Sequence, residues 1–310
     1  AAARRHHLGI TLHHIVSDGW SVGLLANELL RTYEAAVQGR EPDLPPLPFQ
    51  FRDYAAWEER WLNGSAATQQ VDYWRERLAG SLPVVDLPED FDRPRFQTFR
   101  GGLQRRPLST PLNGRVRELS RAQGATPFMT LLAAFSFVLH RLSGLEDLPV
   151  GTPVAGRNRA GTEQLIGAFI NTVVIRSDFR GNPTFAELLQ RTRSLALEAY
   201  RNADVPFDRV VDALNPRRDP GRTPLFQILV NYQESGASDR LELPDLAVEL
   251  HAVEVAMSKF DLTLYLGAHQ GTTMMALSYN ADLFRAARME EMLSQFEQVL
   301  EAVTTRPDRP

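Results

Sequence analysis

Residues 12–21 read Leu-His-His-Ile-Val-Ser-Asp-Gly-Trp-Ser, and the interpretation of the whole chain starts from them. His13 and His14 are followed four residues later by Asp18-Gly19, a combination of mostly rare residue types that chance would place in such a chain on the order of once in a thousand. The period-2 pattern before it predicts a buried strand over 8–14, ending with His14 facing inward. A histidine at a rigid strand end is well placed for proton transfer. The alternative is a strand that ends in an Asp-Gly turn, with purely structural histidines.

Composition and charge exclude several classes of function. The chain has 310 residues and a formal net charge of −4, without a long basic run, so we expect no nucleic-acid partner. The absence of cysteine excludes disulfides, thiolate nucleophiles and cysteine-based zinc sites, and favours a cytoplasmic location. No apolar run approaches the roughly 18 residues of a membrane span. Residues 1–7 contain no initiating methionine and no apolar signal-peptide core, so we expect the chain to begin inside a larger protein.

The first part of the chain is predicted to be mainly helical after the histidine motif. Ser21 is expected to cap a helix that runs to about residue 37 and stops at Gly39. Two short helices are expected next, one carrying Tyr54, Trp57 and Trp61 and the other over about 66–78. A proline-containing connection over 82–94 is the predicted boundary between a first lobe, 1–85, and a second lobe, 86–310.

The second part alternates between strand and helix patterns. Thr126 followed by Pro127 predicts the cap and first residue of a helix, and Thr184 predicts the start of another. The mixture indicates an α/β fold with helices packed on sheets. The remaining predicted elements are strands over 148–154, 171–175, 226–232, 262–266 and 274–279, the last two forming a hairpin around 269–272, and a final helix over 287–303.

Five segments match the sequence pattern of one family in the same order. They are residues 12–21, Phe51-Arg-Asp-Tyr-Ala-Ala-Trp57, Ile166-Gly-Ala-Phe-Ile-Asn-Thr172, Asn202-Ala-Asp-Val-Pro-Phe-Asp208 and Arg218-Asp-Pro-Gly-Arg-Thr-Pro-Leu225. Tyr73-Trp74, Ser258-Lys-Phe-Asp-Leu262 and Tyr279-Asn-Ala-Asp-Leu-Phe284 also match. Together they span nearly the whole chain, which resembles a condensation domain of a nonribosomal peptide synthetase. The type that joins two L-residues is favoured.

The chain departs from the family pattern in three places. Asn202-Ala203 replaces a usual His-Gln pair, and Pro220-Gly221 stands where another residue and a serine are usual. The two motifs that normally precede the His-His segment are absent.

The resemblance implies a V-shaped pseudo-dimer of two lobes related to chloramphenicol acetyltransferase, the first of them incomplete here. It also implies that the amine of an acceptor aminoacyl thioester attacks a donor acyl or peptidyl thioester, so that an amide forms. Both substrates would arrive on phosphopantetheine arms. The implied partners are an upstream and a downstream peptidyl carrier protein and an adjacent adenylation domain, and the domain itself would bind no cofactor. The setting would be the biosynthesis of antibiotics and other secondary metabolites.

His14 is the predicted catalytic residue. An amino group has an ordinary pKa of about 7.7–8.0 and is largely protonated near neutrality, whereas a neutral imidazole can accept its proton. Because a thioester is already activated, positioning could contribute more than base catalysis, and both roles stay open. His13 is predicted to be hydrogen-bonded within the fold. The other histidines show no metal-binding spacing, so no metal is expected.

Four further residues are predicted to support the site. Asp18 is either a partner that orients His14 or a structural anion, and we favour the structural role because a buried carboxylate needs a cation. Arg157, expected in the second lobe, is the proposed cation, with simple solvent exposure as the alternative. Gly19 is expected to permit a close approach of the pantetheine arm or an unusual backbone angle. Asn171 either lines the tunnel or satisfies backbone groups.

Two other classes of function remain open. An epimerization domain or a standalone acyltransferase of the same superfamily shares the His-His-x-x-x-Asp-Gly pattern. A non-catalytic domain of this fold that recruits a partner protein is the third possibility, although the intact His13-His14 pair argues against it.

Overall fold

The computed structural model describes residues 6–233, 240–243, 246–249, 257–269 and 272–309. Contacts divide the chain into two compact units. Unit 1 comprises Ala1–Gly64, Ala155–Ile170 and Glu242–Leu246, and unit 2 comprises Ser65–Val154, Asn171–Leu241 and Ala247–Pro310.

These units differ from the expected lobes in three places, one of which is Glu242–Leu246, expected in the second lobe but part of unit 1. The stretch from Ser65 to residue 85 belongs to unit 2, because helix α3 (Ser65–Arg77) packs against α7 (Phe207–Leu214). Within this packing, Trp74 Nε1 donates a hydrogen bond of 2.8 Å to the carbonyl of Asn202. The segment Ala155–Ile170, expected in the second lobe, belongs to unit 1.

Unit 1 contains α1 (Gly19–Val37), α2 (Phe51–Leu62) and the short 3-10 helix η1 (Thr162–Gln164). The expected helix after the histidine motif is confirmed, but its predicted cap is wrong. Asp18 is the capping residue, since its carboxylate accepts the backbone N–H of Ser21 at 2.8 Å. The helix ends before Gly39, which has the positive φ (66°) that favours glycine after a helix.

The predicted buried strand over 8–14 is wrong. Residues 6–14 form no strand in the structure, and the side chains of Leu8 and Ile10 are 74% and 53% exposed. A strand persists only when its backbone groups pair with a neighbour, and none of the described residues pairs with this segment. One face of α1 is apolar and exposed as well, at Val22, Leu29, Tyr33 and Val37.

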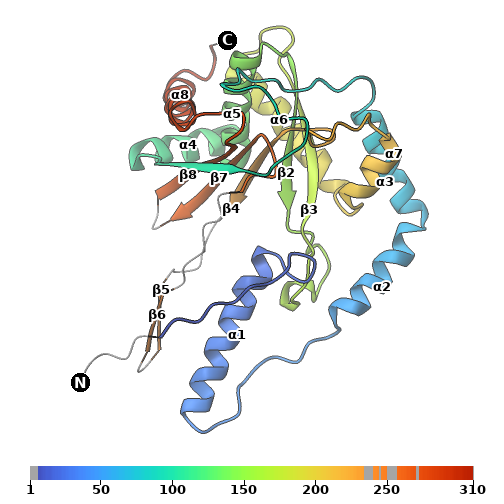
Figure 1. Cartoon of the computed structure of the whole chain (residues 1–310), viewed down its shortest axis with the longest axis vertical. Coiled ribbons are helices and arrows are strands. Elements are labelled where there is room, and N and C mark those ends of the chain that lie inside the picture. Colours follow the sequence, from blue (N-terminus) through green and yellow to red (C-terminus); the bar gives the residue numbers. More distant parts are fainter. Residues whose placement is uncertain (1–5, 234–239, 244–245, 250–256, 270–271, 310) are drawn as a thin grey trace. The chain divides into compact units, whose positions relative to one another are not determined.

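Unit 2 contains a six-stranded mixed sheet with the strand order β1-β8-β7-β4-β2-β3 (Figure 1). The pairs β1–β8, β8–β7 and β2–β3 are antiparallel, whereas β7–β4 and β4–β2 are parallel. The strands are β1 (Gly101–Pro107), β2 (Asp147–Val154), β3 (Asn171–Asp178), β4 (Ile228–Gln233), β7 (Leu262–His269) and β8 (Thr272–Asn280). Strands β5 (Arg240–Leu243) and β6 (Leu246–Glu249) form a separate two-stranded sheet. The turn of the expected hairpin includes residues 270–271, which lie outside the described residues.

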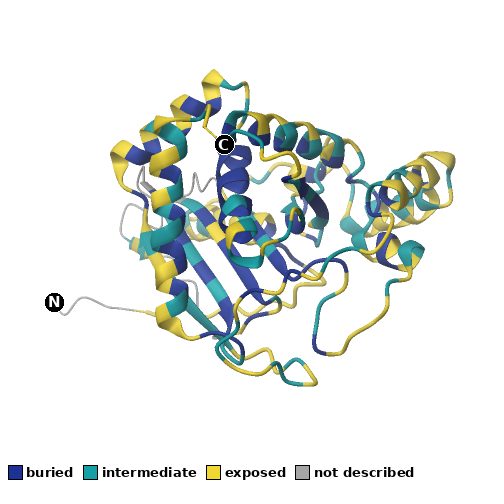
Figure 2. Ribbon diagram, turned by 90° about the horizontal axis from the view of Figure 1, so that it is seen from above, coloured by how far each residue is buried: buried dark blue, intermediate teal, exposed yellow. Residues whose placement is uncertain are grey.

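The core of unit 2 surrounds α5 (Pro127–Ser143), which is buried along most of its length (Figure 2). It packs against the helices α4 (Thr110–Ala122), α6 (Phe185–Arg201) and α8 (Ala286–Thr305). Its predicted start is confirmed: Thr126 accepts the N–H of Met129, and Pro127 occupies the first turn. Among the described helices, none alone is long and apolar enough to cross a membrane; α4 and α5 meet that test only together, with a bend of 106°.

The proline-containing connection after α3 is firmly attached to unit 2. Arg93 forms a bidentate ion pair with the buried carboxylate of Asp261, at 2.8 and 2.7 Å. Asp90 binds the guanidinium of Arg288 in the same way, at 2.8 and 2.7 Å. The motif residue Arg222 reaches Asp86 at 2.5 Å. Motifs distant from the histidines in sequence therefore hold this connection in place.

Candidate active site

His14 lies in an exposed turn between the extended segment and α1. Its Nδ1 is 2.8 Å from the carbonyl oxygen of Ser17. Because a carbonyl oxygen can only accept, Nδ1 must carry the proton, and Nε2 then holds the free lone pair of the neutral ring. The ring is thus oriented by the same turn that leads into α1, and Nε2 is available as a base or hydrogen-bond acceptor.

His13 has the opposite arrangement. The backbone N–H of Ile15 donates to its Nδ1 at 3.1 Å, so this nitrogen holds the lone pair and the proton is on Nε2. The basic nitrogen of His13 is therefore used to stabilise the turn. This agrees with the prediction of a histidine that is hydrogen-bonded within the fold, and it distinguishes the two neighbouring rings.

The Asp18 carboxylate is fully engaged away from His14. One oxygen accepts the N–H and the hydroxyl of Ser21, at 2.8 and 2.7 Å, and the other accepts the N–H of Phe169 at 3.1 Å. Burial raises the pKa of Asp18, but the hydrogen bonds from Ser21 and Arg157 outweigh this effect and lower the pKa below its ordinary value. These contacts favour the structural role of Asp18 over that of a partner for His14.

Arg157 is the cation that Asp18 needs. Its Nη2 lies 3.0 and 3.2 Å from the two carboxylate oxygens, and only 3% and 4% of the two side chains is exposed. The guanidinium also donates to the carbonyl oxygens of Thr162 and Leu165. The expected ion pair is therefore present, and the alternative of a solvent-facing arginine is wrong. Such a buried pair is tolerated because further hydrogen bonds satisfy the Asp18 carboxylate and both Nη groups of Arg157, although its buried Nε has no partner among the described residues.

Ser21 is a supporting residue to which the sequence assigned only a cap. Its fully buried hydroxyl lies 2.9 Å from Arg157 Nη2, 3.0 Å from the N–H of Gly167 and 2.8 Å from the carbonyl oxygen of Gly167. A serine three residues after a helix cap gives no signal for these partners, because they are 136 and 146 residues away in sequence.

The segment 155–170 fits closely against α1 and α2. A Cβ atom at Gly156, whose φ is +66°, would meet the carbonyl oxygen of Phe169 at 1.8 Å, and one at Gly167 would meet the ring of Phe51 at 2.1 Å. The Phe169 ring packs edge-on against Phe51, with centroids 5.0 Å apart, and lies 4.2 Å from the guanidinium carbon of Arg157. This packing explains two of the matched motifs, since Phe51 begins one and Phe169 lies in another.

One of the two alternatives expected for Gly19 needs correction. Gly19 is the first residue of α1 and is absent from the positive-φ glycines of the described chain, so it has no unusual backbone angle; its role in a close approach stays a prediction. The neighbouring Trp20 is 52% exposed. Its indole N–H is nevertheless fixed at 2.9 Å to the carbonyl oxygen of Glu163.

Asn171 belongs to unit 2, and both the nitrogen and the oxygen of its side-chain amide are hydrogen-bonded to backbone groups. Its Nδ2 donates to the carbonyl oxygens of Ala203 and Val205 at 2.9 and 2.7 Å, and its Oδ1 accepts the N–H groups of Thr172 and Phe207 at 2.8 and 2.9 Å. The structure therefore favours the second of the two expected roles, the satisfaction of backbone groups.

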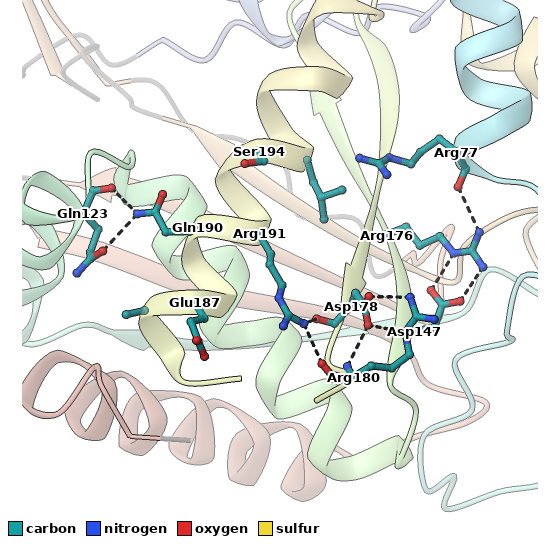
Figure 3. Close-up of a pocket in the computed structure, with 12 residues that line it drawn as sticks. Arg77, Gln123, Asp147, Arg176, Asp178, Arg180, Glu187, Gln190, Arg191 and Ser194 are labelled. Carbon is teal, nitrogen blue, oxygen red and sulfur yellow. Dashed lines mark hydrogen bonds and ion pairs between the residues drawn. The ribbon is translucent and has the colours of Figure 1, made fainter. Parts of the chain in front are cut away.

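A cavity of about 970 Å³ in unit 2 is lined by arginines and carboxylates, but it lacks the features of an acid–base site (Figure 3). Two of its three carboxylates, Asp147 and Asp178, form bidentate ion pairs with Arg176 and Arg180, and the third, Glu187, accepts hydrogen bonds from Thr184. The hydrogen bond from Arg180 lowers the pKa of Asp178 to about 2, which keeps this carboxylate ionised. The described residues also contain no group of three or more potential metal ligands.

Comparison with known proteins gives consistent results. The family model described as "Condensation domain" matches residues 1–310. One of the linear gramicidin synthase proteins of Brevibacillus parabrevis is 44% identical over 302 residues, which are 96% of this chain and 6% of that synthase protein. Malpinin synthetase of Mortierella alpina is 42% identical over 301 residues, which are 97% of this chain and 4% of that synthetase. The chain therefore spans a small part of such relatives.

Solved structures share the fold. The X-domain from teicoplanin biosynthesis is 30% identical, with a TM-score of 0.88 over 96% of this chain and 69% of the X-domain chain. The four-domain nonribosomal peptide synthetase AB3403, solved with AMP and glycine, is 26% identical, with a TM-score of 0.86 over 96% of this chain and 23% of that protein. These similarities confirm the α/β fold class that the sequence predicts.

Proposed function

The chain belongs to the condensation-domain family of nonribosomal peptide synthetases, and we propose that it forms an amide bond between two carrier-bound thioesters. The observation that carries the proposal is the free Nε2 of His14, since its Nδ1 is hydrogen-bonded to the carbonyl of Ser17. The proposed substrates are a donor acyl or peptidyl thioester and an acceptor aminoacyl thioester, each on a phosphopantetheine arm.

In the proposed reaction, the acceptor amine attacks the carbonyl carbon of the donor thioester. The C–N bond forms and the C–S bond breaks, so that the donor arm leaves as a thiolate. The amine loses a proton, which His14 Nε2 accepts if this residue is the base, and the thiolate takes up a proton to give the free thiol. The amide product stays on the acceptor arm. The domain supplies no cofactor to this reaction, and His14 acts either as the base or by orienting the amine.

The rest of unit 1 supports His14 indirectly. Asp18 caps α1 and binds Arg157, and Ser21 binds the backbone of Gly167. These contacts fix the start of α1, and with it the turn whose Ser17 carbonyl orients the His14 ring. We therefore propose that His14 takes part in the reaction. His13, Asp18, Gly19 and Arg157 would hold the site in place.

The partners that we propose are an upstream and a downstream peptidyl carrier protein and an adjacent adenylation domain. The similarity to a four-domain synthetase supports this context. A cytoplasmic location stays a prediction from the cysteine-free sequence.

A second candidate is a domain of this fold that binds a partner protein without catalysis. The TM-score of 0.88 to the X-domain, which has also been solved in complex with OxyB, favours this candidate. The adjacent histidines and the free Nε2 of His14 favour catalysis. An epimerization domain is the third candidate. Its product would differ from the amide that the first candidate forms, so an assay of the product distinguishes the two.

The test uses the synthetase that contains this chain, with both carrier proteins loaded. His14→Ala is expected to lower the rate of dipeptidyl thioester formation by about 10²–10⁴-fold, the range for a lost acid–base residue, and His13→Ala by much less. Mass spectrometry of the acceptor carrier measures the product. An unchanged rate in His14→Ala would exclude the catalytic assignment. Racemised aminoacyl thioester without an amide would indicate epimerization, and neither product from the wild type would favour the partner-binding candidate.

A further inference from the structure

We propose that unit 2 holds a second binding site, separate from the histidine motif, for a small organic anion with an aromatic or branched aliphatic body. The site is a cavity of about 470 Å³ between the helices α5, α6 and α8. This volume lies within the range of roughly 300–1,000 Å³ that is typical of small-molecule sites. All of its lining residues belong to unit 2, whereas His14 belongs to unit 1.

The walls of the cavity are apolar and ordered by specific contacts. The rings of His140 and Phe179 stack with their centroids 4.4 Å apart and an angle of 7° between the planes. The His140 ring is fixed because its Nδ1 lies 2.7 Å from the carbonyl oxygen of Leu145. Phe137, Leu188 and Val303 complete the apolar lining. A planar or branched hydrocarbon would therefore enter a preformed aromatic wall, which limits the entropy lost on binding.

The charged groups at this cavity are all basic. Arg306 and Arg309 line it, and the lining includes no acidic residue. Within the described part of the chain, neither guanidinium has an ion-pair partner, and both residues are exposed. A ligand whose carboxylate meets these guanidinium groups would gain charge-assisted hydrogen bonds without displacing an existing partner. This charge pattern selects an anion over a neutral or cationic ligand.

Residues 306–309 also shape the site. The backbone N–H groups of Phe185 and Ala186, in the first turn of α6, donate to the carbonyl oxygens of Arg309 and Pro307 at 3.2 and 2.9 Å. These two N–H groups are thus already satisfied, so the anion would be bound by arginine side chains and not by the start of the helix. The same contacts hold the 306–309 backbone beside the cavity.

Biphenyl-4-carboxylate is a suitable probe, and biphenyl-4-methanol is its neutral match. Titrated into the 310-residue protein, the carboxylate is expected to bind saturably by calorimetry and to shift the methyl NMR signals of Leu188, Val299 and Val303. The double variant Arg306→Gln/Arg309→Gln should weaken binding by about three- to tenfold, as expected for partly exposed charges. Arg117→Gln, at an exposed arginine on α4, is the matched control and should leave the affinity unchanged.

Val303→Phe should abolish binding by filling the cavity, with near-ultraviolet circular dichroism used to verify the fold. The arginine variants keep the test decisive if this variant misfolds. The proposal is overturned if binding of biphenyl-4-carboxylate does not saturate, or if this probe shifts only the NMR signals of methyl groups outside the cavity. Equal binding of biphenyl-4-methanol would also overturn it. Undiminished binding in the arginine variants would overturn it too. None of these readouts depends on amide formation.

Discussion

The Ser21 hydroxyl lies between the two backbone groups of Gly167, 3.0 Å from its N–H and 2.8 Å from its carbonyl oxygen. This contact joins the first turn of α1 to the segment 155–170, which also provides Arg157 for Asp18. Both ends of that segment continue into strands, β2 and β3, of unit 2. The turn that carries His14 is therefore supported by a segment 146 residues away in the chain.

Ser21→Ala is expected to destabilise the protein by about 1–3 kcal/mol, because it leaves the buried N–H of Gly167 without its partner. Urea unfolding measures the change in the free energy of unfolding, and hydrogen exchange of the Gly167 amide should become faster. Ser194→Ala, at an exposed position on α6, is the matched control and should change stability by less than about 0.5 kcal/mol. Equal effects of the two substitutions would contradict the importance of this contact.

The two histidines are expected to have opposite neutral tautomers. His14 should carry its proton on Nδ1 and His13 on Nε2, because one Nδ1 faces a carbonyl oxygen and the other accepts an amide N–H. Nitrogen-15 NMR of the labelled imidazole rings in their neutral form distinguishes the two tautomers. If His14 shows a protonated Nε2, the free lone pair on which the proposed chemistry depends is absent.

Asp18 and Arg157 are expected to be strongly coupled energetically. Removing one partner of a buried ion pair costs about 3–5 kcal/mol, and Asp18→Asn, Arg157→Gln and the double variant give the coupling energy by a double-mutant cycle. The pair Asp178–Arg180, with side chains 39% and 73% exposed, is the control and should show coupling of about 0.2–1 kcal/mol. Additive effects at Asp18 and Arg157 would rule out a stabilising pair.

The Asp18–Arg157 pair predicts that the free energy of unfolding falls as the pH is lowered. The pKa of Asp18 is below its ordinary value of 3.8 in the folded protein, so its contribution to stability is present above 3.8 and is lost as the pH falls through the lowered pKa. Between about pH 5 and pH 3, the wild type should therefore lose more unfolding free energy than Asp18→Asn does. Equal losses of unfolding free energy in the two proteins would show that folding does not change the pKa of Asp18.

Gly167→Ala should be among the most damaging small substitutions in unit 1. The new methyl group would lie 2.1 Å from the Phe51 ring, and either the ring or the 155–170 backbone must move. We expect a loss of about 1–3 kcal/mol from this overpacking. Gly114→Ala, in α4 with open space around it, is the control and should be stabilising by up to about 1 kcal/mol. Thermal unfolding compares the two variants.

Much of unit 2 could be predicted from local signals. Thr126 with Pro127 and Thr184 with Glu187 identify the starts of α5 and α6, because capping depends on residues three apart. The strands β2, β3, β4, β7 and β8 were recognised from their apolar residues. The helices α4 and α7 and the strands β1, β5 and β6 were not predicted. Strand β1 contains two glycines, two arginines and a proline, and it exists by pairing with β8.

The prediction of a strand over 8–14 was wrong for a different physical reason. The alternating pattern is present, but the pattern indicates only which face would be buried. A strand forms when another strand supplies its hydrogen bonds, and none of the described residues does so here.

The sequence by itself identified the family and the side chain that we propose for the chemistry, His14, from residues 12–21 and the segments that match in order. It also suggested that Asp18 needs a cation and proposed Arg157 for that role, with solvent exposure of Arg157 as the alternative. Only the tertiary structure decided that Arg157 pairs with Asp18 from 139 residues away, that Ser21 binds Gly167 and that His14 Nε2 is the free nitrogen. The reason is that residue type and periodicity are local properties, whereas the partner of a buried charge or hydroxyl is chosen by the packing of distant segments.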